Sequence, residues 1–187
     1  MNRPGLKLSH LGLFVYDMQV MEDFYTRVLE FTVTDRGRLP IGDTGKFADV
    51  VFTSRDPDEH HQIVLVSGRP AQISFNIINQ LSMRADSLGT LRKMYQRFVD
   101  EKVPNLVAVT HGNAISIYGL DPEGARIELY IDTPWYVSQP CRVPVDFGLD
   151  DAALMQWAEQ HARELPGFKP RAQWRAEMAR RMGVSET

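Results

Sequence analysis

The sequence predicts an α+β protein of two tandem βαβββ modules that form a curved mixed sheet around a cleft, followed by a C-terminal strap and two helices. Three observations favour this fold: a repeat at an offset of 70 residues, a change from strand to helix periodicity inside each copy, and the end of both periodicities after residue 132. We therefore expect one structural domain, with a first module at 1–68, a second module at 69–132, and the strap with its helical tail at 133–187.

The repeat aligns LSHLGLFVYDMQVMEDFYTRVLEF, which starts at Leu8, with INQLSMRADSLGTLRKMYQRFVDE, which starts at Ile78. The alignment has no gap, and it places His10 on Gln80. Any two amphipathic strand–helix pairs look somewhat alike, but the matching tyrosines and helix stripe favour duplication. A lone module would expose one face of its sheet, and two copies can bury that face by packing together.

The first module begins with alternating apolar residues at Leu11, Leu13 and Val15, the period-two pattern of a half-buried strand. A helix capped by Asp17 is expected next. Its apolar stripe at helical spacing consists of Met21, Phe24, Tyr25 and Val28. Three strands follow, at Phe31 to Asp35, Phe47 to Thr53 and His61 to Ser67.

The second module repeats this order, with Ser87 as the helix cap. The helix stripe consists of Leu88, Leu91, Met94, Tyr95 and Phe98. The strands are expected at Leu106 to Thr110, Asn113 to Tyr118 and Arg126 to Ile131, with GLDPEGAR as a hairpin turn between the last two. Beyond residue 132 a proline-containing strap is expected, and helices follow at Asp150 to Leu165 and Ala172 to Met182.

Composition and charge exclude several classes of function. The chain has 187 residues, with 21 Lys and Arg against 24 Asp and Glu, and no concentrated basic run, so nucleic acid is not an expected partner. No apolar stretch is long enough for a membrane span, and the amino end lacks a signal-peptide pattern. Because Cys141 is the single cysteine, we expect a reducing compartment, most simply the cytoplasm.

Three polar side chains are expected in otherwise apolar strands. His10 and Gln80 occupy matching places on the first strand of each module, and Glu128 lies within RIELYI. A buried carboxylate needs a cation, a hydrogen-bond network or a raised pKa, and one metal ion would satisfy all three side chains. The alternatives are a core histidine, a glutamine hydrogen-bonded across the cleft, and an ion pair of Glu128 with an arginine such as Arg84.

These segments carry a resemblance. LSHLGLFVYDMQVMEDFYTRVLEF and LDPEGARIELYID resemble the opening and closing motifs of the vicinal oxygen chelate superfamily, which includes glyoxalases, extradiol dioxygenases, epimerases and antibiotic-resistance proteins. The resemblance extends from Leu6 to Asp132. Within the superfamily, HHQIVL at His60 and THGNAISIYGLDPEG resemble the catalytic module of extradiol dioxygenases.

The resemblance implies roles for individual residues. His10 and Glu128 match metal ligands, His61 matches a histidine beside the substrate and oxygen site, and Tyr118 matches a tyrosine that hydrogen-bonds the bound diol. Two positions depart from the dioxygenase pattern. Gln80 stands where those enzymes have the second metal-binding histidine.

The second departure is Asn113, which stands where those enzymes usually have the acid–base histidine. His111 lies two residues before it, and on a strand it would point to the same face and could substitute.

The resemblance implies a divalent metal, with Fe(II) first. An amide oxygen at Gln80 is a harder and weaker donor than imidazole, so we expect looser iron retention and more tolerance of Mn(II), Mg(II) or Zn(II). Glyoxalases and epimerases of this superfamily generally place a fourth ligand or base where this chain has Val64. The sequence therefore fits the three-ligand site of dioxygenases better than the site of glyoxalases and epimerases, which abstract a carbon-bound proton.

The expected function is a metal-dependent extradiol-type dioxygenase that cleaves a catechol-like aromatic diol with O2, with His61 and Tyr118 as catalytic groups and His111 and Asn113 as further candidates. The alternatives are a non-catalytic protein that binds or sequesters small molecules, and a metal-dependent glyoxalase- or epimerase-like isomerase or lyase. The resemblance also implies a homodimer or a higher homo-oligomer.

Overall fold

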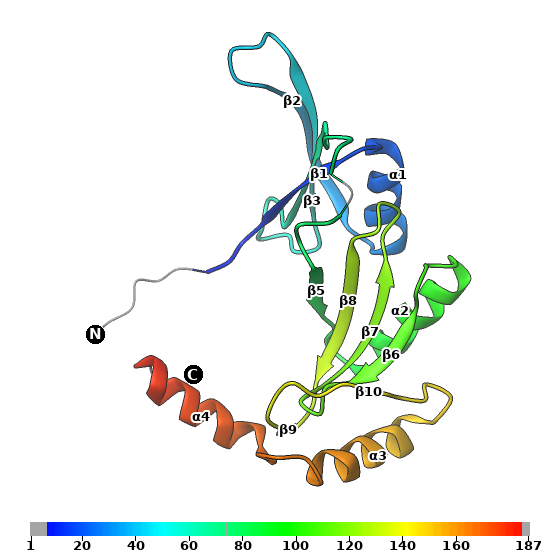
Figure 1. Ribbon diagram of the computed structural model, residues 1–187, viewed down its shortest axis with the longest axis vertical. Helices are drawn as coiled ribbons and strands as arrows, with labels where there is room; N and C mark the ends of the chain where they lie inside the picture. The colour runs from blue at the N-terminus through cyan, green and yellow to red at the C-terminus, as the bar shows by residue number, and fades with distance from the viewer. Residues whose placement is uncertain (1–6, 74, 185–187) are drawn as a thin grey trace. The chain divides into compact units, whose positions relative to one another are not determined.

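The computed structural model describes residues 7–73 and 75–184 (Figure 1). It confirms an α+β fold with mixed sheets. The chain forms two compact units, which are described separately. Of the described residues, the N-terminal unit contains 7–73, 75–79 and the hairpin 120–125, and the C-terminal unit contains 80–119 and 126–184. The division into modules at residues 68 and 132 stays a prediction. Residues 1–6 of the predicted first module and residues 185–187 of the predicted tail lie outside the described ranges.

The N-terminal unit has the order strand, helix and three strands. Its elements are β1 (Leu11–Val15), α1 (Met18–Asp23), the π-helical turn η1 (Phe24–Val28), β2 (Thr32–Pro40), β3 (Phe47–Ser54) and β4 (Ile63–Ser67). The sheet order is β1-β4-β3-β2, in which β1 and β4 are parallel and the other pairs are antiparallel. The predicted βαβββ order of the first module is therefore confirmed.

Local sequence explains why this helix begins and packs where it does. The Asp17 carboxylate accepts a hydrogen bond from the Val20 N–H at 3.0 Å, which satisfies a backbone donor at the start of α1. The predicted apolar stripe is buried, and its members are Met21, Phe24, Tyr25 and Val28. Burial of this stripe against the sheet stabilises the unit, because each large apolar side chain removed from water contributes about 1.5–3 kcal/mol.

Two strand boundaries of this unit differ from the prediction by two residues or more. β2 continues to Pro40 instead of ending at Asp35, because its polar second half pairs with β3 although it lacks apolar alternation. β4 begins at Ile63, so His61 lies in the turn before the strand and not on it. His60 and His61 consequently do not point to opposite faces of a sheet.

The C-terminal unit repeats the same order and extends it. Its elements are β5 (Gln80–Arg84), α2 (Leu88–Asp100), β6 (Val107–Thr110), β7 (Ala114–Leu120), β8 (Arg126–Asp132), β9 (Trp135–Tyr136), β10 (Val143–Pro144), α3 (Asp151–Arg163), β11 (Lys169–Pro170) and α4 (Arg171–Met182). The main sheet has the order β10-β6-β7-β8-β5, with β5 and β8 parallel. The βαβββ order is confirmed in the second copy as well.

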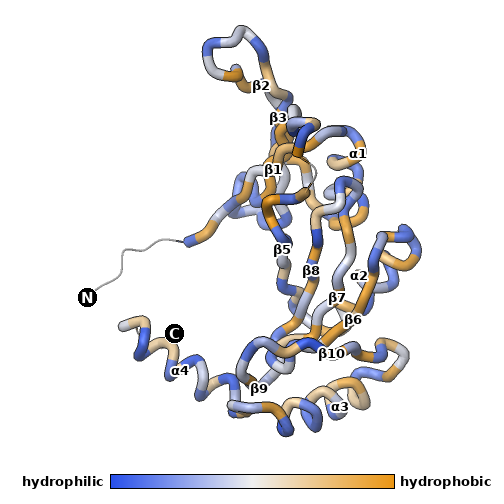
Figure 2. Tube along the Cα trace, viewed as in Figure 1, coloured by the Kyte–Doolittle hydropathy of each residue, from blue (hydrophilic) through white to orange (hydrophobic). Residues whose placement is uncertain are grey.

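Helix α2 packs against this sheet (Figure 1). The contact requires a glycine on β7, because a Cβ atom at Gly119 would lie 2.5 Å from Val103 Cγ1 and 3.2 Å from the ring of Phe98. Figure 2 shows the apolar character of β6, in which Val109 is buried. No helix in the described ranges combines the length and the apolar character that a bilayer crossing requires.

The strap and the tail helices belong to the same compact unit as the second βαβββ copy. The strap was expected to lack regular structure, but β10 pairs with β6 through Val143↔Thr110 and Pro144↔Val109. The Trp135 indole donates a hydrogen bond to the Gly112 carbonyl at 2.5 Å. The strap is therefore attached to β6 and to the turn that joins β6 to β7.

Candidate active site

The parallel strand pairs place equivalent residues of the two copies in the same register. In the C-terminal unit Ser82 of β5 pairs with Glu128 of β8. In the N-terminal unit Gly12 of β1 pairs with Val64 of β4. Val64 therefore takes the place of Glu128 in the first copy, as the repeat predicts, and this copy carries no carboxylate at that position.

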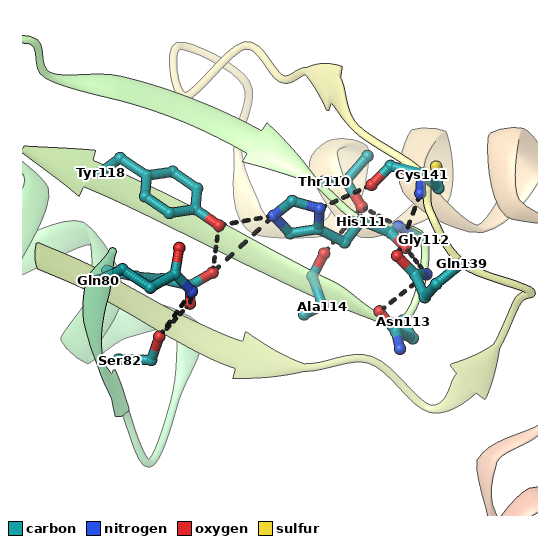
Figure 3. Close-up of polar contacts among 11 residues, drawn as sticks. Gln80, Ser82, Thr110, His111, Gly112, Asn113, Ala114, Tyr118, Gln139 and Cys141 are labelled. Carbon is teal, nitrogen blue, oxygen red and sulfur yellow. Dashed lines mark hydrogen bonds and ion pairs between the residues drawn. The ribbon is translucent and has the colours of Figure 1, made fainter. Parts of the chain in front are cut away.

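Glu128 is the centre of a polar cluster in the C-terminal unit. Figure 3 labels its hydrogen-bond partners Gln80, Ser82 and Tyr118. Its side chain is buried, with the residue 8% exposed. One carboxylate oxygen, Oε2, accepts hydrogen bonds from the Gln80 amide at 3.0 Å and from the Ser82 hydroxyl at 2.5 Å. The other, Oε1, accepts from the Tyr118 hydroxyl at 2.5 Å. These donors compensate the carboxylate for its loss of water.

Tyr118 links this carboxylate to a histidine. Its hydroxyl lies 2.8 Å from His111 Nε2, and that nitrogen is 3.8 Å from Glu128 Oε1. Burial, and after it the hydrogen bond to Glu128, raises the pKa of Tyr118 well above its usual value. Tyr118 therefore stays a neutral hydroxyl at neutral pH, able to donate to one oxygen or nitrogen at a time.

His111 is held at its other ring nitrogen. Nδ1 lies 2.6 Å from the backbone carbonyl of Cys141. A carbonyl only accepts hydrogen bonds, so Nδ1 carries a proton, and in neutral His111 the Nε2 atom is the acceptor that faces Tyr118. Glu128, Tyr118 and His111 thus form one row, in which the single proton of the Tyr118 hydroxyl can be donated either to Glu128 Oε1 or to His111 Nε2, and Tyr118 lies within hydrogen-bond distance of both.

Asn113 does not join this row. His111, Gly112 and Asn113 form the turn between β6 and β7, so His111 and Asn113 are not alternate residues of one strand. Gly112 adopts a φ of 73°, which changes the chain direction between the two side chains. The Asn113 Oδ1 atom accepts a 3.4 Å hydrogen bond from Gln139 instead (Figure 3).

The two remaining predicted residues lie together in the N-terminal unit. The rings of His10 and His61 are 4.3 Å apart between centroids, and His61 also contacts the edge of Phe52 at 5.2 Å. His60 Nδ1 lies 2.9 Å from His61 Nδ1, so one of these nitrogens donates and the other accepts. Partial burial, and then the nearby His10 and His60, lowers the pKa of His61, which favours the neutral imidazole that a base or a metal ligand needs.

The structure therefore brings the predicted residues together in two groups. Gln80, His111, Tyr118 and Glu128 meet in one unit, and His10 meets His61 in the other. The joining of His10 with Gln80 and Glu128 in one metal site stays a prediction. Within residues 7–73 and 75–184, no three or more His, Cys, Asp and Glu side chains are grouped so that they could hold a metal ion.

Sequence reasoning missed Ser82 and the contribution of the strap. Ser82 lies two residues after Gln80 and so shares its face of β5, which is a signal that strand periodicity contains. The contact of His111 with the carbonyl of Cys141 has no such signal, because the two residues are 30 positions apart and a backbone carbonyl is present at every residue. The suggested partner of Glu128, Arg84, instead forms an ion pair with Asp132 at 3.2 Å.

The donor set can be tested against a divalent metal. A carboxylate offers about four lone-pair positions, and three donors contact Glu128, so one position remains for a cation. Gln80 uses its amide nitrogen for both of its hydrogen bonds, to Ser82 and Glu128, which leaves its carbonyl oxygen for a ligand. Carboxylate and amide oxygens suit Mg(II) and Mn(II), and an added imidazole suits Fe(II) or Zn(II).

Known proteins resemble this chain in sequence and in fold. Biphenyl-2,3-diol 1,2-dioxygenase 2 of Rhodococcus globerulus is 27% identical over 130 residues, which are 67% of this chain and 63% of that protein's length. The chain thus spans less than two thirds of this curated relative. The fosfomycin resistance protein FosX of Listeria monocytogenes, solved with Mn(II) and sulfate, has a TM-score of 0.52 at 18% identity and covers 68% of this chain and 93% of its own.

A glyoxalase/bleomycin resistance protein/dioxygenase domain from a Frankia species has a TM-score of 0.55 at 19% identity, over 71% of this chain and 94% of its own. At these identities the two solved structures bear on the fold alone. The profile of the Glyoxalase/Bleomycin resistance protein/Dioxygenase superfamily matches residues 7–129, which is more than half of the chain. With the repeated βαβββ order and the parallel pairing of first and last strands in each copy, this match establishes that the chain belongs to the glyoxalase/bleomycin resistance protein/dioxygenase superfamily, the vicinal oxygen chelate proteins.

Proposed function

We propose that this protein is a metal-dependent extradiol-type dioxygenase that cleaves a catechol-like aromatic diol with O2. Members of its superfamily are mostly enzymes that act on small molecules, and they bind divalent metals such as manganese or iron. The observation that carries the proposal is the row of Glu128, Tyr118 and His111, in which one neutral hydroxyl lies within hydrogen-bond distance of both a carboxylate and an imidazole. The relative that acts on biphenyl-2,3-diol supports the same chemistry.

In this proposal His10, Gln80 and Glu128 hold the metal. Iron in the divalent state is the first choice, and Mn(II), Mg(II) and Zn(II) are tolerated because Gln80 supplies a hard oxygen donor. When bound, the metal supplies a Lewis-acidic and redox-active centre for the diol and for O2. Ser82 keeps the carboxylate of Glu128 oriented through its 2.5 Å hydrogen bond.

The other residues handle the diol and its protons. The Tyr118 hydroxyl, held neutral by its raised pKa, donates a hydrogen bond that orients a diol oxygen. His111 accepts a proton at Nε2, the nitrogen that faces Tyr118. His61, whose lowered pKa keeps it neutral, is a second acid–base group from the N-terminal unit. Asn113 has no role in this scheme because its side chain contacts Gln139.

Anaerobic reconstitution tests the proposal. The protein is loaded with Fe(II), exposed to a panel of catechols that includes biphenyl-2,3-diol, and followed by O2 uptake and by the appearance of a yellow ring-fission product. We expect stoichiometric O2 uptake with at least one diol, loss of turnover in Glu128→Gln, and unchanged turnover in Glu164→Gln, an exposed control in the same unit. Full iron loading without O2 uptake on any diol would contradict the proposal.

One observation favours a second candidate, a protein that binds or sequesters small aromatic molecules without turnover. Glu128 already accepts three hydrogen bonds from the chain itself, so the carboxylate is compensated without a metal. Elemental analysis of protein purified without added metal separates the two candidates. The second one predicts little or no bound metal, together with a rise in Tm when aromatic ligands are added.

Exchange of Gln80 for histidine separates the dioxygenase from the non-catalytic binding protein more sharply. In the dioxygenase proposal Gln80→His replaces a weak oxygen donor by imidazole, so we expect Fe(II) affinity to rise by about tenfold. Anaerobic competition with a chromogenic chelator measures this affinity. The control is Gln96→His on α2, where an exposed glutamine hydrogen-bonds Asp100, and it should leave the affinity unchanged. Equal affinities in wild type and Gln80→His would place residue 80 outside the metal site.

A homodimer or higher homo-oligomer of the chain and a cytoplasmic location belong to the same proposal. Size-exclusion chromatography with light scattering at two protein concentrations tests the first. An isomerase or lyase of the glyoxalase or epimerase kind has less support, because Val64 stands in the register position of Glu128 and supplies neither a ligand nor a base.

A further inference from the structure

We propose that the C-terminal strap, residues 133–146, is part of the active site and that it fixes the tautomer and orientation of His111. In this role Gln139 is a positioning residue, and the Cys141 backbone carbonyl is the group that selects the tautomer. The catalytic consequence rests on the proposed dioxygenase function, but the structural claim does not.

The first step of the argument is the contact at Nδ1. The Cys141 carbonyl lies 2.6 Å from His111 Nδ1 and accepts its proton. The isolated imidazole prefers neither nitrogen strongly enough to order a site, so the partner of one nitrogen decides the state of the other. With Nδ1 protonated, the lone pair of Nε2 faces the Tyr118 hydroxyl at 2.8 Å.

The second step is how the strap is held at this position. The Gln139 side chain bridges the two segments: its amide nitrogen donates to the His111 carbonyl at 2.7 Å, and its amide oxygen accepts from the Cys141 N–H at 3.1 Å. Figure 3 shows this side chain lying between the backbone at His111 and the backbone at Cys141. Gln139 therefore acts through His111, because its side-chain hydrogen bonds go to the β6–β7 turn and to the strap and not to Tyr118 or Glu128.

The third step is the register beyond the bridge. Val143 pairs with Thr110, the residue before His111, and the Val145 N–H donates to the Ala108 carbonyl at 3.1 Å. The strap thus runs along β6 as an added antiparallel strand, which prevents Cys141 from sliding relative to His111. The guanidinium of Arg142 lies over the Tyr118 ring, 5.8 Å from its centroid, so the strap contacts both members of the pair.

The experiment reads the tautomer directly. The full-length protein is labelled with ¹⁵N-histidine, and long-range ¹H–¹⁵N correlation spectra distinguish a protonated from an unprotonated ring nitrogen. The His111 signals are assigned as those missing from His111→Gln. We expect Nδ1 of His111 to carry a proton that exchanges slowly with water. A His111 ring protonated at Nε2 alone would overturn the inference.

Variants test the part played by Gln139. Gln139→Leu removes both hydrogen bonds of the bridge, and we expect exchange of the Nδ1 proton to become about tenfold faster. Gln96→Leu, which removes a hydrogen bond from an exposed glutamine on α2, is the matched control and should change nothing. An unchanged exchange rate in Gln139→Leu, or an equal change in both variants, would overturn the positioning role.

Gln139→Glu keeps the acceptor for the Cys141 N–H but loses the donor to the His111 carbonyl. If Gln139→Leu does not fold, Gln139→Glu tests the positioning role in its place. We expect the same acceleration, with exchange of the His111 Nδ1 proton about tenfold faster. In an active enzyme Gln139→Leu should lower kcat by about tenfold or more with little change in KM, since Gln139 acts through His111 in this proposal. The tautomer is read without turnover, so a failure of the dioxygenase proposal leaves this test intact.

Discussion

Two buried tyrosines show that the contribution of a hydroxyl to folding stability depends on its surroundings. The Tyr118 hydroxyl donates to Glu128 at 2.5 Å, whereas the Tyr25 hydroxyl is buried with no hydrogen-bond partner in the part of the chain that the structure describes. A buried carboxylate that loses a donor becomes less stable, but a buried hydroxyl without a partner contributes only its cost of desolvation.

Tyr118→Phe should therefore lower the free energy of unfolding by about 1–3 kcal/mol, and Tyr25→Phe should leave it unchanged or raise it. Urea unfolding followed by far-UV circular dichroism measures both variants under one condition. Equal losses in the two variants would mean that the Tyr118 hydroxyl contributes no net hydrogen-bond stabilisation to Glu128.

At the scale of elements, the turn between β6 and β7 decides which polar residues enter the site. Gly112 has a φ of 73°, and a Cβ atom there would lie 2.2 Å from Val137 Cγ2 in the strap. The turn needs glycine for two separate reasons: the left-handed backbone, and the close approach of the strap.

A pair of substitutions separates these reasons. Gly68→Ala changes a glycine with a φ of 97° and open space around it, so it should cost about 1 kcal/mol from the backbone alone. Gly112→Ala adds the collision with Val137 and should cost about 2–4 kcal/mol. Thermal unfolding of both variants checks the order, and a smaller loss for Gly112→Ala would show that the strap moves aside without cost.

At the scale of the whole molecule, the hairpin 120–125 of the second copy belongs to the N-terminal unit. The Glu123 carboxylate accepts hydrogen bonds from the Tyr16 and Asp17 N–H groups at 2.7 and 2.9 Å and lies 3.3 Å from the Arg69 guanidinium. Asp121 accepts from the N–H groups of Glu123 and Ala125 through Oδ1. The stability of the chain therefore depends on charged groups that this hairpin buries.

Asp121 makes the free energy of unfolding depend on pH in a definite direction. Burial raises the pKa of Asp121 from 3.8 to about 6, although its two backbone hydrogen bonds act in the opposite sense. The folded chain thus keeps the proton to a higher pH than the unfolded chain does. Between pH about 4 and about 6 the folded state binds more protons, so the unfolding free energy falls as pH rises through this window, and the loss is complete above it.

Asp121→Asn should remove this part of the pH dependence and raise the unfolding free energy at pH 7 by on the order of 2 kcal/mol, because an amide keeps the acceptor oxygen without the charge. Urea unfolding from pH 4 to pH 8 measures the difference between wild type and variant. Asp43→Asn, an exposed substitution in the same unit, is the control and should follow the wild-type curve. Parallel curves for wild type and Asp121→Asn would refute the assignment.

The sequence by itself determined the repeated βαβββ order, the caps at Asp17 and Ser87 and the buried apolar stripe of the first helix, and of the second stripe it determined the buried Leu91 and Phe98. These features depend on periodicity and on contacts within a few residues, which one chain displays directly. The same periodicity, with the resemblance, singled out Gln80, Tyr118 and Glu128, because a polar residue in an apolar strand stands out from its neighbours.

Only the tertiary structure decided which of these side chains meet and in what state. The parallel register of β5 and β8 places Ser82 beside Glu128, the turn at Gly112 separates His111 from Asn113, and the strap supplies a carbonyl to His111. Each of these outcomes depends on strand pairing or backbone direction between segments far apart in the chain. Local side-chain patterns do not encode backbone contacts of that kind, because every residue carries the same N–H and C=O groups except proline, which lacks the N–H.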